Sequence, residues 1–229
     1  MKSKITLSAL ALGLALSVAP FTHAQDLNID DFKVGGYQSP QFYSGSRHLS
    51  SQNGSPTHII GGNRSSNLNV CAATPCPVNN PFNQPSSYQY RPSTNGGPSA
   101  LLFKSGYYAG PRLDFAYGGG APMKADFTGY KSGWIRMNFK GLTENLNFGV
   151  LLYTGGVYAQ SGCNLAAYPG DFSIEIPFSL FHDHGVDLSN INTMDFFFQS
   201  GSPIGGVNLL VTSIEVSNSH KANALTCFF

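Results

Sequence analysis

The chain has 229 residues, of which 41% are hydrophobic and only 11% are charged, and its formal net charge is +1. This composition excludes a surface basic enough to follow a phosphate backbone, so nucleic acid is not an expected partner. A polar but nearly neutral surface suits uncharged ligands such as sugars better than charged ones. The length suits one domain that is large enough to bury its own core.

The N-terminus has the features of a cleaved secretory signal peptide. Two lysines within the first four residues precede an apolar stretch from Ile5 to Val18, and a small-x-Ala cleavage site ends at Ala24. We expect a signal peptide over residues 1–24 and one mature domain over residues 25–229, secreted or, alternatively, periplasmic. No later segment reaches the ~20 apolar residues of a spanning helix, so no transmembrane segment is expected after cleavage.

The stretch from Val34 to Pro98 is rich in Gly, Ser, Asn, Pro and Tyr and has few apolar runs. Such a composition is typical of loops. Residues 65–98 are therefore expected to form a long loop-rich insertion over the domain rather than a domain of their own. Short strands are expected in or beside this stretch at Asp31–Val34, His58–Gly61 and Asn67–Val70.

From Leu101 onward, short apolar segments recur at the spacing of an all-β domain. Several alternate with period two: Ile135, Met137 and Phe139 face one side of their segment, and polar neighbours face the other. The expected fold is all-β, a single antiparallel β-sandwich. The expected strands are Ala100–Lys104, Arg112–Tyr117, Ala125–Phe127, Gly133–Phe139, Leu146–Tyr153, Asp171–Ile176, Met194–Gln199 and Val207–Val216, and one helical turn is expected at Phe178–His182.

The four cysteines are expected to form two disulfides, because an even count in an exported chain favours this. Three pairings exist. Cys71–Cys76 with Cys163–Cys227 is favoured, since the first two cysteines share one short loop. Zinc is the alternative, but the spacing of Cys71 and Cys76 is not followed by a second matching pair.

The order of several short segments resembles that of secreted bacterial jelly-roll proteins related to carbohydrate-binding modules of the galactose-binding-like type. Those segments are Ile29–Phe32, Ile59–Arg64, Ala125–Tyr130, Ile176–Phe181, Asp187–Ile191 and Val211–Val216. They cover most of the mature chain, and the resemblance implies a jelly roll that binds a glycan. The chain departs from the pattern in the insertion between Ser65 and Gly97 and in its cysteines.

The resemblance also implies that the first and last strands meet and that a structural calcium ion lies near their ends. Asp30, Asp31 and Glu215 are the candidate ligands, because calcium prefers oxygen donors. The alternative is that these acids only cap or solvate the strand ends. His182 and His184 are weaker candidates for a metal site, since such pairs are more often solvated loop residues.

The candidate ligand-binding residues lie on the polar sides of predicted strands. Trp134 can stack on a sugar, while Arg136 and Asn138 donate to its hydroxyls. The alternative is that a single Trp in a sandwich belongs to the core. The remaining candidates are Tyr153, Asp171 and Glu175, with Tyr107, Tyr108 and Tyr158 as further loop aromatics. Asp171 and Glu175 are about 13 Å apart along a strand, too far for a hydrolytic pair.

The favoured hypothesis is a secreted, non-catalytic protein that binds a glycan or a host or matrix surface. The second is a secreted effector or structural protein that binds an extracellular protein. The third is a hydrolase, although no H-E-x-x-H, G-x-S-x-G or P-loop motif occurs. A small outer-membrane barrel is the last alternative, because the chain is poor in charge and ends at Phe229. No catalytic residue and no cofactor besides calcium are expected.

Overall fold

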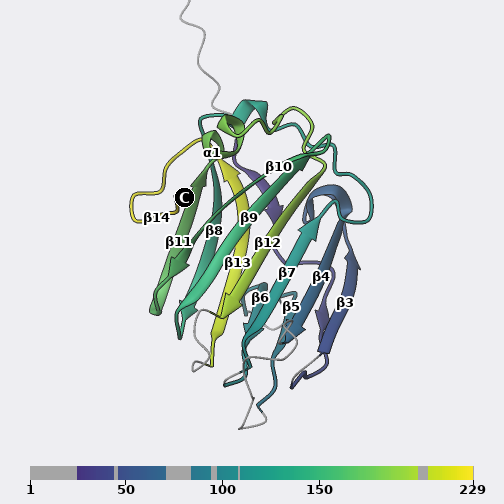
Figure 1. The fold of residues 1–229 in the computed structure, drawn as a ribbon, viewed down its shortest axis with the longest axis vertical. Coiled ribbons are helices and arrows are strands. Elements are labelled where there is room, and N and C mark those ends of the chain that lie inside the picture. Colours follow the sequence, from purple (N-terminus) through teal and green to yellow (C-terminus); the bar gives the residue numbers. More distant parts are fainter. Residues whose placement is uncertain are drawn as a thin grey trace, which may run out of the picture.

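The fold is described by a computed structural model that covers residues 25–43, 46–70, 84–93, 97–107, 109–200 and 206–228. Two β-sheets pack against each other, and their strands run mainly along the long axis of the molecule (Figure 1). Short helical segments and loops gather at the end where α1 is labelled. None of the helices in the covered residues is long and apolar enough to cross a bilayer.

The first sheet has eight strands in the order β14-β11-β8-β13-β6-β5-β2, and β1 pairs with β13 beside β6. All neighbours in it are antiparallel except β11 and β14. Its strands are β1 (Leu27–Asp30), β2 (Tyr37–Gln38), β5 (Ser87–Arg91), β6 (Ala100–Lys104), β8 (Trp134–Leu142), β11 (Tyr168–Pro177), β13 (Asn208–Ser217) and β14 (Leu225–Thr226).

The second sheet has six antiparallel strands in the order β10-β9-β12-β7-β4-β3. Its strands are β3 (Ser46–Asn53), β4 (Asn63–Val70), β7 (Pro111–Tyr117), β9 (Leu146–Thr154), β10 (Val157–Leu165) and β12 (Thr193–Ser200). The helical segments are η1 (Ile60–Gly62), η2 (Thr128–Tyr130) and α1 (Phe178–Asp183).

The core lies between the sheets and is rich in phenylalanine. Phe198 of β12 packs on Phe139 of β8 with 6.3 Å between ring centroids and on Phe103 of β6 with 6.4 Å. Because alternate residues of a strand face opposite sides, the strict alternation of β7 buries Leu113, Phe115 and Tyr117 and turns its polar residues outward. Burial of these side chains is the main favourable contribution to folding.

The expected all-β antiparallel sandwich is confirmed, and β6 has the predicted bounds. The predicted meeting of the first and last long strands is also confirmed, because β1 pairs with β13. The predicted segments Asn67–Val70, Arg112–Tyr117, Gly133–Phe139, Leu146–Tyr153, Asp171–Ile176, Met194–Gln199 and Val207–Val216 lie within or almost within β4, β7, β8, β9, β11, β12 and β13.

Three predicted strands are wrong. Asp31–Val34 follows β1 as a turn, in which Phe32 adopts a left-handed conformation with φ 56°. His58–Gly61 runs into η1, and Ala125 makes only an isolated bridge to Ile191. The expected insertion also contributes strands: β4 ends in the second sheet and β5 lies in the first, so residues 65–98 are not all loop.

A disulfide joins edge strands of the two sheets. Cys163 lies in β10 and Cys227 directly follows β14, and the two cysteines are bonded as predicted. The other predicted pair, Cys71 and Cys76, lies outside the described residues.

Candidate functional site

The outer side of the six-stranded sheet carries many Asn, Gln and Ser side chains, and we call it the amide-rich face. Alternation along six paired strands places its residues side by side. The amide-rich face consists of Arg47, Leu49, Ser51, Asn63, Ser65, Asn67, Asn69, Arg112, Asp114, Ala116, Asn147, Leu151, Tyr153, Tyr158, Gln160, Asn164, Thr193, Asp195, Phe197 and Gln199.

An aromatic pair borders this face at the β9–β10 hairpin. Gly155 and Gly156 form the two-residue turn, and both have positive φ angles, 50° and 94°, which suit a tight hairpin. The turn sets the register that places Tyr158 opposite Tyr153. Their rings stack with centroids 5.6 Å apart, and Tyr158 is 63% exposed. This pair therefore presents a flat apolar surface to solvent.

Four residues further along β12 from the partner of Tyr153, Phe197 lies over Gly149 of β9. A Cβ atom at Gly149 would come within 2.2 Å of the Phe197 ring, so only glycine permits this position. The Arg112 guanidinium covers the same ring, with its central carbon 4.1 Å from the centroid. The ring is consequently held between a neighbouring strand and an arginine.

Two carboxylates and one arginine lie in the middle of the amide-rich face. Arg112 donates to Asp114 Oδ1 at 2.7 Å on the same strand. Asp195 lies diagonally across on β12, and its Oδ1 atom is buried without a hydrogen-bond partner in the described residues. Burial raises the pKa of Asp195 to about 7, the charge of Asp114 raises it further, and Arg112 opposes the shift.

A groove of about 530 Å³ runs over this part of the face. It is lined by side chains of β3, β4, β7 and β12, among them Asn67, Asn69, Arg112, Asp114 and Asp195. Amides and carboxylates that line a groove beside an exposed aromatic pair can hydrogen-bond and stack a ligand with many hydroxyls.

The predicted site residues Trp134, Arg136 and Asn138 do lie on one side of β8, but their polar groups are already paired. Arg136 donates to Glu175 at 2.7 Å and to Glu215 at 2.8 Å, and it also bonds the Ser219 carbonyl. These side chains lie beneath the segment that follows β13.

Residues of the same segment also contact the other two predicted residues of β8, Asn138 and Trp134. Asn138 accepts from Ser173 at 2.6 Å and from Lys221 at 3.1 Å. The Trp134 ring packs against His220, with centroids 5.1 Å apart. The described contacts of these residues thus hold the C-terminal segment on the eight-stranded sheet.

The predicted ligand-binding residues do not form one site. Tyr153 belongs to the amide-rich face of the other sheet, whereas Asp171 and Glu175 lie on β11. Glu175 is fully buried between Arg136 and His220. Of this predicted set, only Tyr153 belongs to the amide-rich face.

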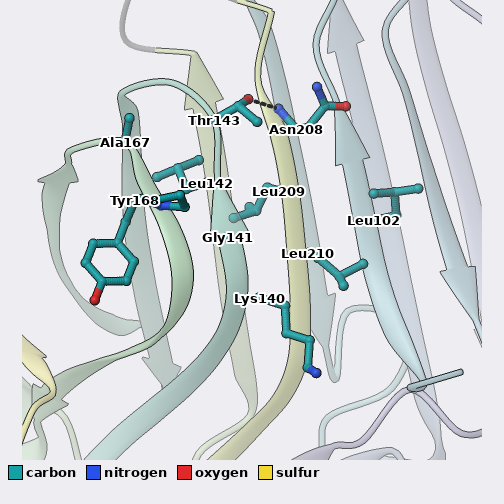
Figure 2. A pocket seen from close by; sticks show the side chains of 11 residues that line it. Leu102, Lys140, Gly141, Leu142, Thr143, Ala167, Tyr168, Asn208, Leu209 and Leu210 are labelled. Atoms are coloured by element: carbon teal, nitrogen blue, oxygen red, sulfur yellow. Dashed lines mark hydrogen bonds between the residues drawn. The ribbon is translucent and has the colours of Figure 1, made fainter.

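Hollows also occur on the eight-stranded sheet. Figure 2 shows one of about 530 Å³, with Leu102 and Leu210 on one side, Tyr168 on the other and Lys140 at one end. At its opposite end Asn208 donates a backbone hydrogen bond to Thr143 at 2.8 Å (Figure 2). A neighbouring hollow of about 700 Å³ is lined by the predicted residues Asn138 and Asp171.

The predicted calcium ligands do not converge. Asp30 is fully buried and bonds Arg64, with the Tyr117 hydroxyl donating at 2.8 Å. Asp31 instead pairs with Lys33 at 3.0 Å and with His58. Glu215 pairs with Arg136 on the other side of the sheet. Each carboxylate is thus engaged by its own cation.

The histidine candidates also have local partners. His184 Nδ1 lies 2.6 Å from the Leu180 carbonyl, and His182 lies 3.5 Å from Asp183. Among the described residues, no three His, Cys, Asp or Glu side chains are grouped so that they could hold a metal ion.

No protein-family model and no curated protein matches the sequence. Among solved structures, the family 30 carbohydrate-binding module of a Clostridium thermocellum cellulosomal cellulase is similar at 15% identity. That match has a TM-score of 0.46 and covers 86% of this chain and 99% of that one. Another similar structure is the family 11 module from Clostridium thermocellum in complex with a β-1,3-1,4-mixed-linked tetrasaccharide, at 14% identity and with a TM-score of 0.39. That match covers 88% of this chain and 97% of the module.

An agarase is also similar, at 12% identity and TM-score 0.41, over 54% of this chain and 21% of that one. The matched part is therefore about a fifth of the agarase. Carbohydrate-binding modules of families 11 and 30 thus recur among the similar structures, each with a TM-score below 0.5.

Sequence reasoning missed most of the amide-rich face. Three of its charged residues could have been found, because they alternate with apolar residues inside two predicted strands: Arg112 and Asp114 in one and Asp195 in the other. The Asn and Ser residues of β3 and β4 carried no such signal, since their composition is that of a loop.

Proposed function

We propose that the protein is a secreted, non-catalytic binding protein whose amide-rich face holds a neutral glycan. The observation that carries this proposal is the Tyr153–Tyr158 stack on the same face as a groove lined by Ser and Asn side chains together with Arg112, Asp114 and Asp195. Sugar rings have apolar faces that stack on aromatic rings and hydroxyls that pair with amides and carboxylates. The disulfide between Cys163 and Cys227 supports a place outside the reducing cytoplasm.

Shape and chemistry of the face also favour a chain over a single sugar. The aromatic pair lies at the β10 side of the sheet, whereas the groove extends over β7, β4 and β3. Neighbouring strands are about 4.8 Å apart, so this path spans several sugar units. An oligosaccharide that crosses the strands would contact both the tyrosines and the central carboxylates.

Removal of either tyrosine ring is expected to weaken glycan binding at least tenfold. Exposed aromatic anchors commonly contribute most of the binding energy of a face, and tenfold corresponds to about 1.4 kcal/mol. The measurement is affinity gel electrophoresis of the exported chain and its Tyr153→Ala and Tyr158→Ala variants. The gels contain mixed-linkage β-1,3-1,4-glucan, agarose or the anionic control alginate.

Two control variants make this experiment specific. Tyr168→Ala removes a tyrosine that is 48% exposed on the eight-stranded sheet and should leave retardation unchanged. Trp134→Ala tests the face predicted from the sequence. Binding that is lost with Trp134 and kept without Tyr153 and Tyr158 would move the site to the eight-stranded sheet. No retardation in any gel would favour a protein partner instead.

A glycoside hydrolase is the second candidate. The observation that favours it is the pair Asp114 and Asp195, in which Asp114 is bonded to Arg112 and Asp195 has a pKa raised to about 7. Diagonal residues on neighbouring strands are about 7 Å apart, within the range for inverting enzymes. Chromatography of oligosaccharides after prolonged incubation tests this candidate, since new reducing ends would show cleavage.

A further inference from the structure

Asp195 is the least satisfied acid of the amide-rich face. It lies on the central strand β12 between β7 and β9, and its cross-strand neighbours are Ala116 and Leu151, which offer no hydrogen bond. Its Oδ1 atom is buried and has no partner among the described residues, although the backbone N–H of Phe196 donates to the carboxyl. A buried carboxylate oxygen without a donor is costly, so the free protein leaves part of this group's hydrogen-bonding capacity unused.

The charged and titratable groups around Asp195 stabilise its ionised form only in part. From β7 it faces Asp114, which repels its charge, and Arg112, whose guanidinium is bonded to Asp114. From β9 it faces Tyr153, and the nearest titratable group beyond is Tyr158 on β10. β4 contributes only Ser and Asn to this side, and on β3 Arg47 is bonded to Asn67.

We propose that Asp195 exchanges a proton for the ligand: it is partly protonated in the free protein at neutral pH and ionises when sugar hydroxyls in the groove donate to it. This inference rests on the proposed glycan function and adds its regulation. The proton released from the carboxyl goes to solvent, and the carboxylate gains charge-assisted hydrogen bonds from the ligand. Binding is therefore weaker in acid and stronger above neutrality.

The physical cause is the balance between desolvation and hydrogen bonding. Burial and the charge of Asp114 penalise the ionised form in the free protein and raise the pKa of Asp195 to about 7. Hydroxyl donors stabilise only that ionised form, so the bound state has a lower pKa. By linkage, apparent affinity falls about tenfold per pH unit below the free-state pKa, until the bound-state pKa is reached.

The same arrangement defines the ligand class. A uronate or sulfate placed over Asp195 would meet the charge of Asp114 and, once ionised, that of Asp195. Like charges this close disfavour an anionic group at this position. A neutral sugar with adjacent hydroxyls is consequently the ligand that this part of the groove accepts.

A ligand-free experiment tests the protonation itself. Asp195 ionises near 3.8 in an unfolded chain and near 7 in the folded one, so its contribution to the free energy of unfolding should fall between these pH values and level off above them. Asp195→Asn removes this loss, and its melting temperature should exceed that of the wild type by an amount that grows from pH 4 to about 7. The matched control is Asp171→Asn, which changes an exposed acid on the other sheet. Its melting temperature should change with pH as that of the wild type does.

Calorimetry with ligand tests the exchange. The full exported chain is titrated at pH 7 with the mixed-linked β-1,3-1,4-glucan tetrasaccharide, or with agarotetraose if agarose retards it, in two buffers of different ionisation enthalpy. About half a proton should be released per ligand in the wild type and in Asp171→Asn, and none in Asp195→Asn. Wild-type affinity should fall about tenfold from pH 8 to pH 6.

The outcomes separate the two proposals. Binding without proton release, or release that persists in Asp195→Asn, would overturn the exchange and leave the glycan function standing. A melting-temperature difference that does not change with pH would overturn it as well. Absence of binding to every polysaccharide at every pH would instead refute the glycan function, and the exchange with it.

Discussion

Replacement of Asp30 by Ala is expected to lower the free energy of unfolding by about 3 to 5 kcal/mol, a large part of the stability of a typical domain. Asp30 and Arg64 form an ion pair in which both side chains are fully buried. Loss of the carboxylate would leave the guanidinium charged and without its anion in the core. Equilibrium unfolding in urea measures the effect.

The surroundings of this pair explain why one partner cannot be removed alone. The Arg64 guanidinium lies over the Tyr90 ring, with 3.5 Å between its central carbon and the centroid, and donates to the Gly35 carbonyl at 3.2 Å. Burial raises the pKa of Asp30 even though Arg64 opposes this shift. For Arg64 burial lowers the pKa, but the charge of Asp30 and the other groups around the guanidinium together raise it by more, so the ionised form is disfavoured in one partner and favoured in the other. Removal of either one leaves a buried group without its counter-charge.

Two variants test this explanation. Asp31→Ala removes the neighbouring acid, whose cationic partner Lys33 is 60% exposed, and should cost no more than about 1 kcal/mol. A double variant with Asp30→Asn and Arg64→Met removes both charges and should recover much of the loss. A double variant no more stable than Asp30→Ala would contradict the explanation.

Loss of the disulfide between Cys163 and Cys227 is expected to cost about 4 kcal/mol, because the bond closes a long loop in the unfolded chain. The two cysteines are separated by 64 positions in the sequence. The change is made as Cys163→Ala with Cys227→Ala, and urea unfolding of the oxidised proteins gives the difference.

A nearby variant controls for disturbance of β10. Ser161 lies two residues before Cys163, and its buried hydroxyl has no hydrogen-bond partner in the described part of the chain. Ser161→Ala should change the free energy of unfolding by less than about 0.5 kcal/mol. If it is as destabilising as the double cysteine variant, packing of β10 rather than the covalent bond stabilises this edge.

The sequence predicts the long central strands well, because their apolar residues alternate or cluster. β5 was missed although Tyr88 and Tyr90 alternate with polar residues, since the surrounding prolines favour loops. β3 carries little apolar signal, because it turns His48, Ser50 and Gln52 toward the other sheet. There the Ser50 hydroxyl lies 2.5 Å from the Tyr88 hydroxyl. Such hydrogen bonds allow the polar side chains of this strand to pack against the other sheet.

The site was harder to predict than the fold. The two-residue alternation of side chains along β8 correctly places Trp134, Arg136 and Asn138 on one side of the strand. Only the tertiary structure shows that the segment after β13 covers them. Tyr153 was selected as an aromatic residue, yet its pairing with Tyr158 depends on the hairpin register. The burial of Asp195 depends on β7 and β9, which lie more than 40 positions away in the sequence.

The topology also fixes how the molecule would be oriented when it is tethered. β1 and β14, the first and last strands described, both belong to the eight-stranded sheet. The amide-rich face lies on the outer side of the opposite sheet. A bead, sensor chip or fluorescent fusion attached through β1 would therefore leave the amide-rich face turned away from the attachment, whereas β14 is linked through Cys227 to β10, the strand that carries Tyr158.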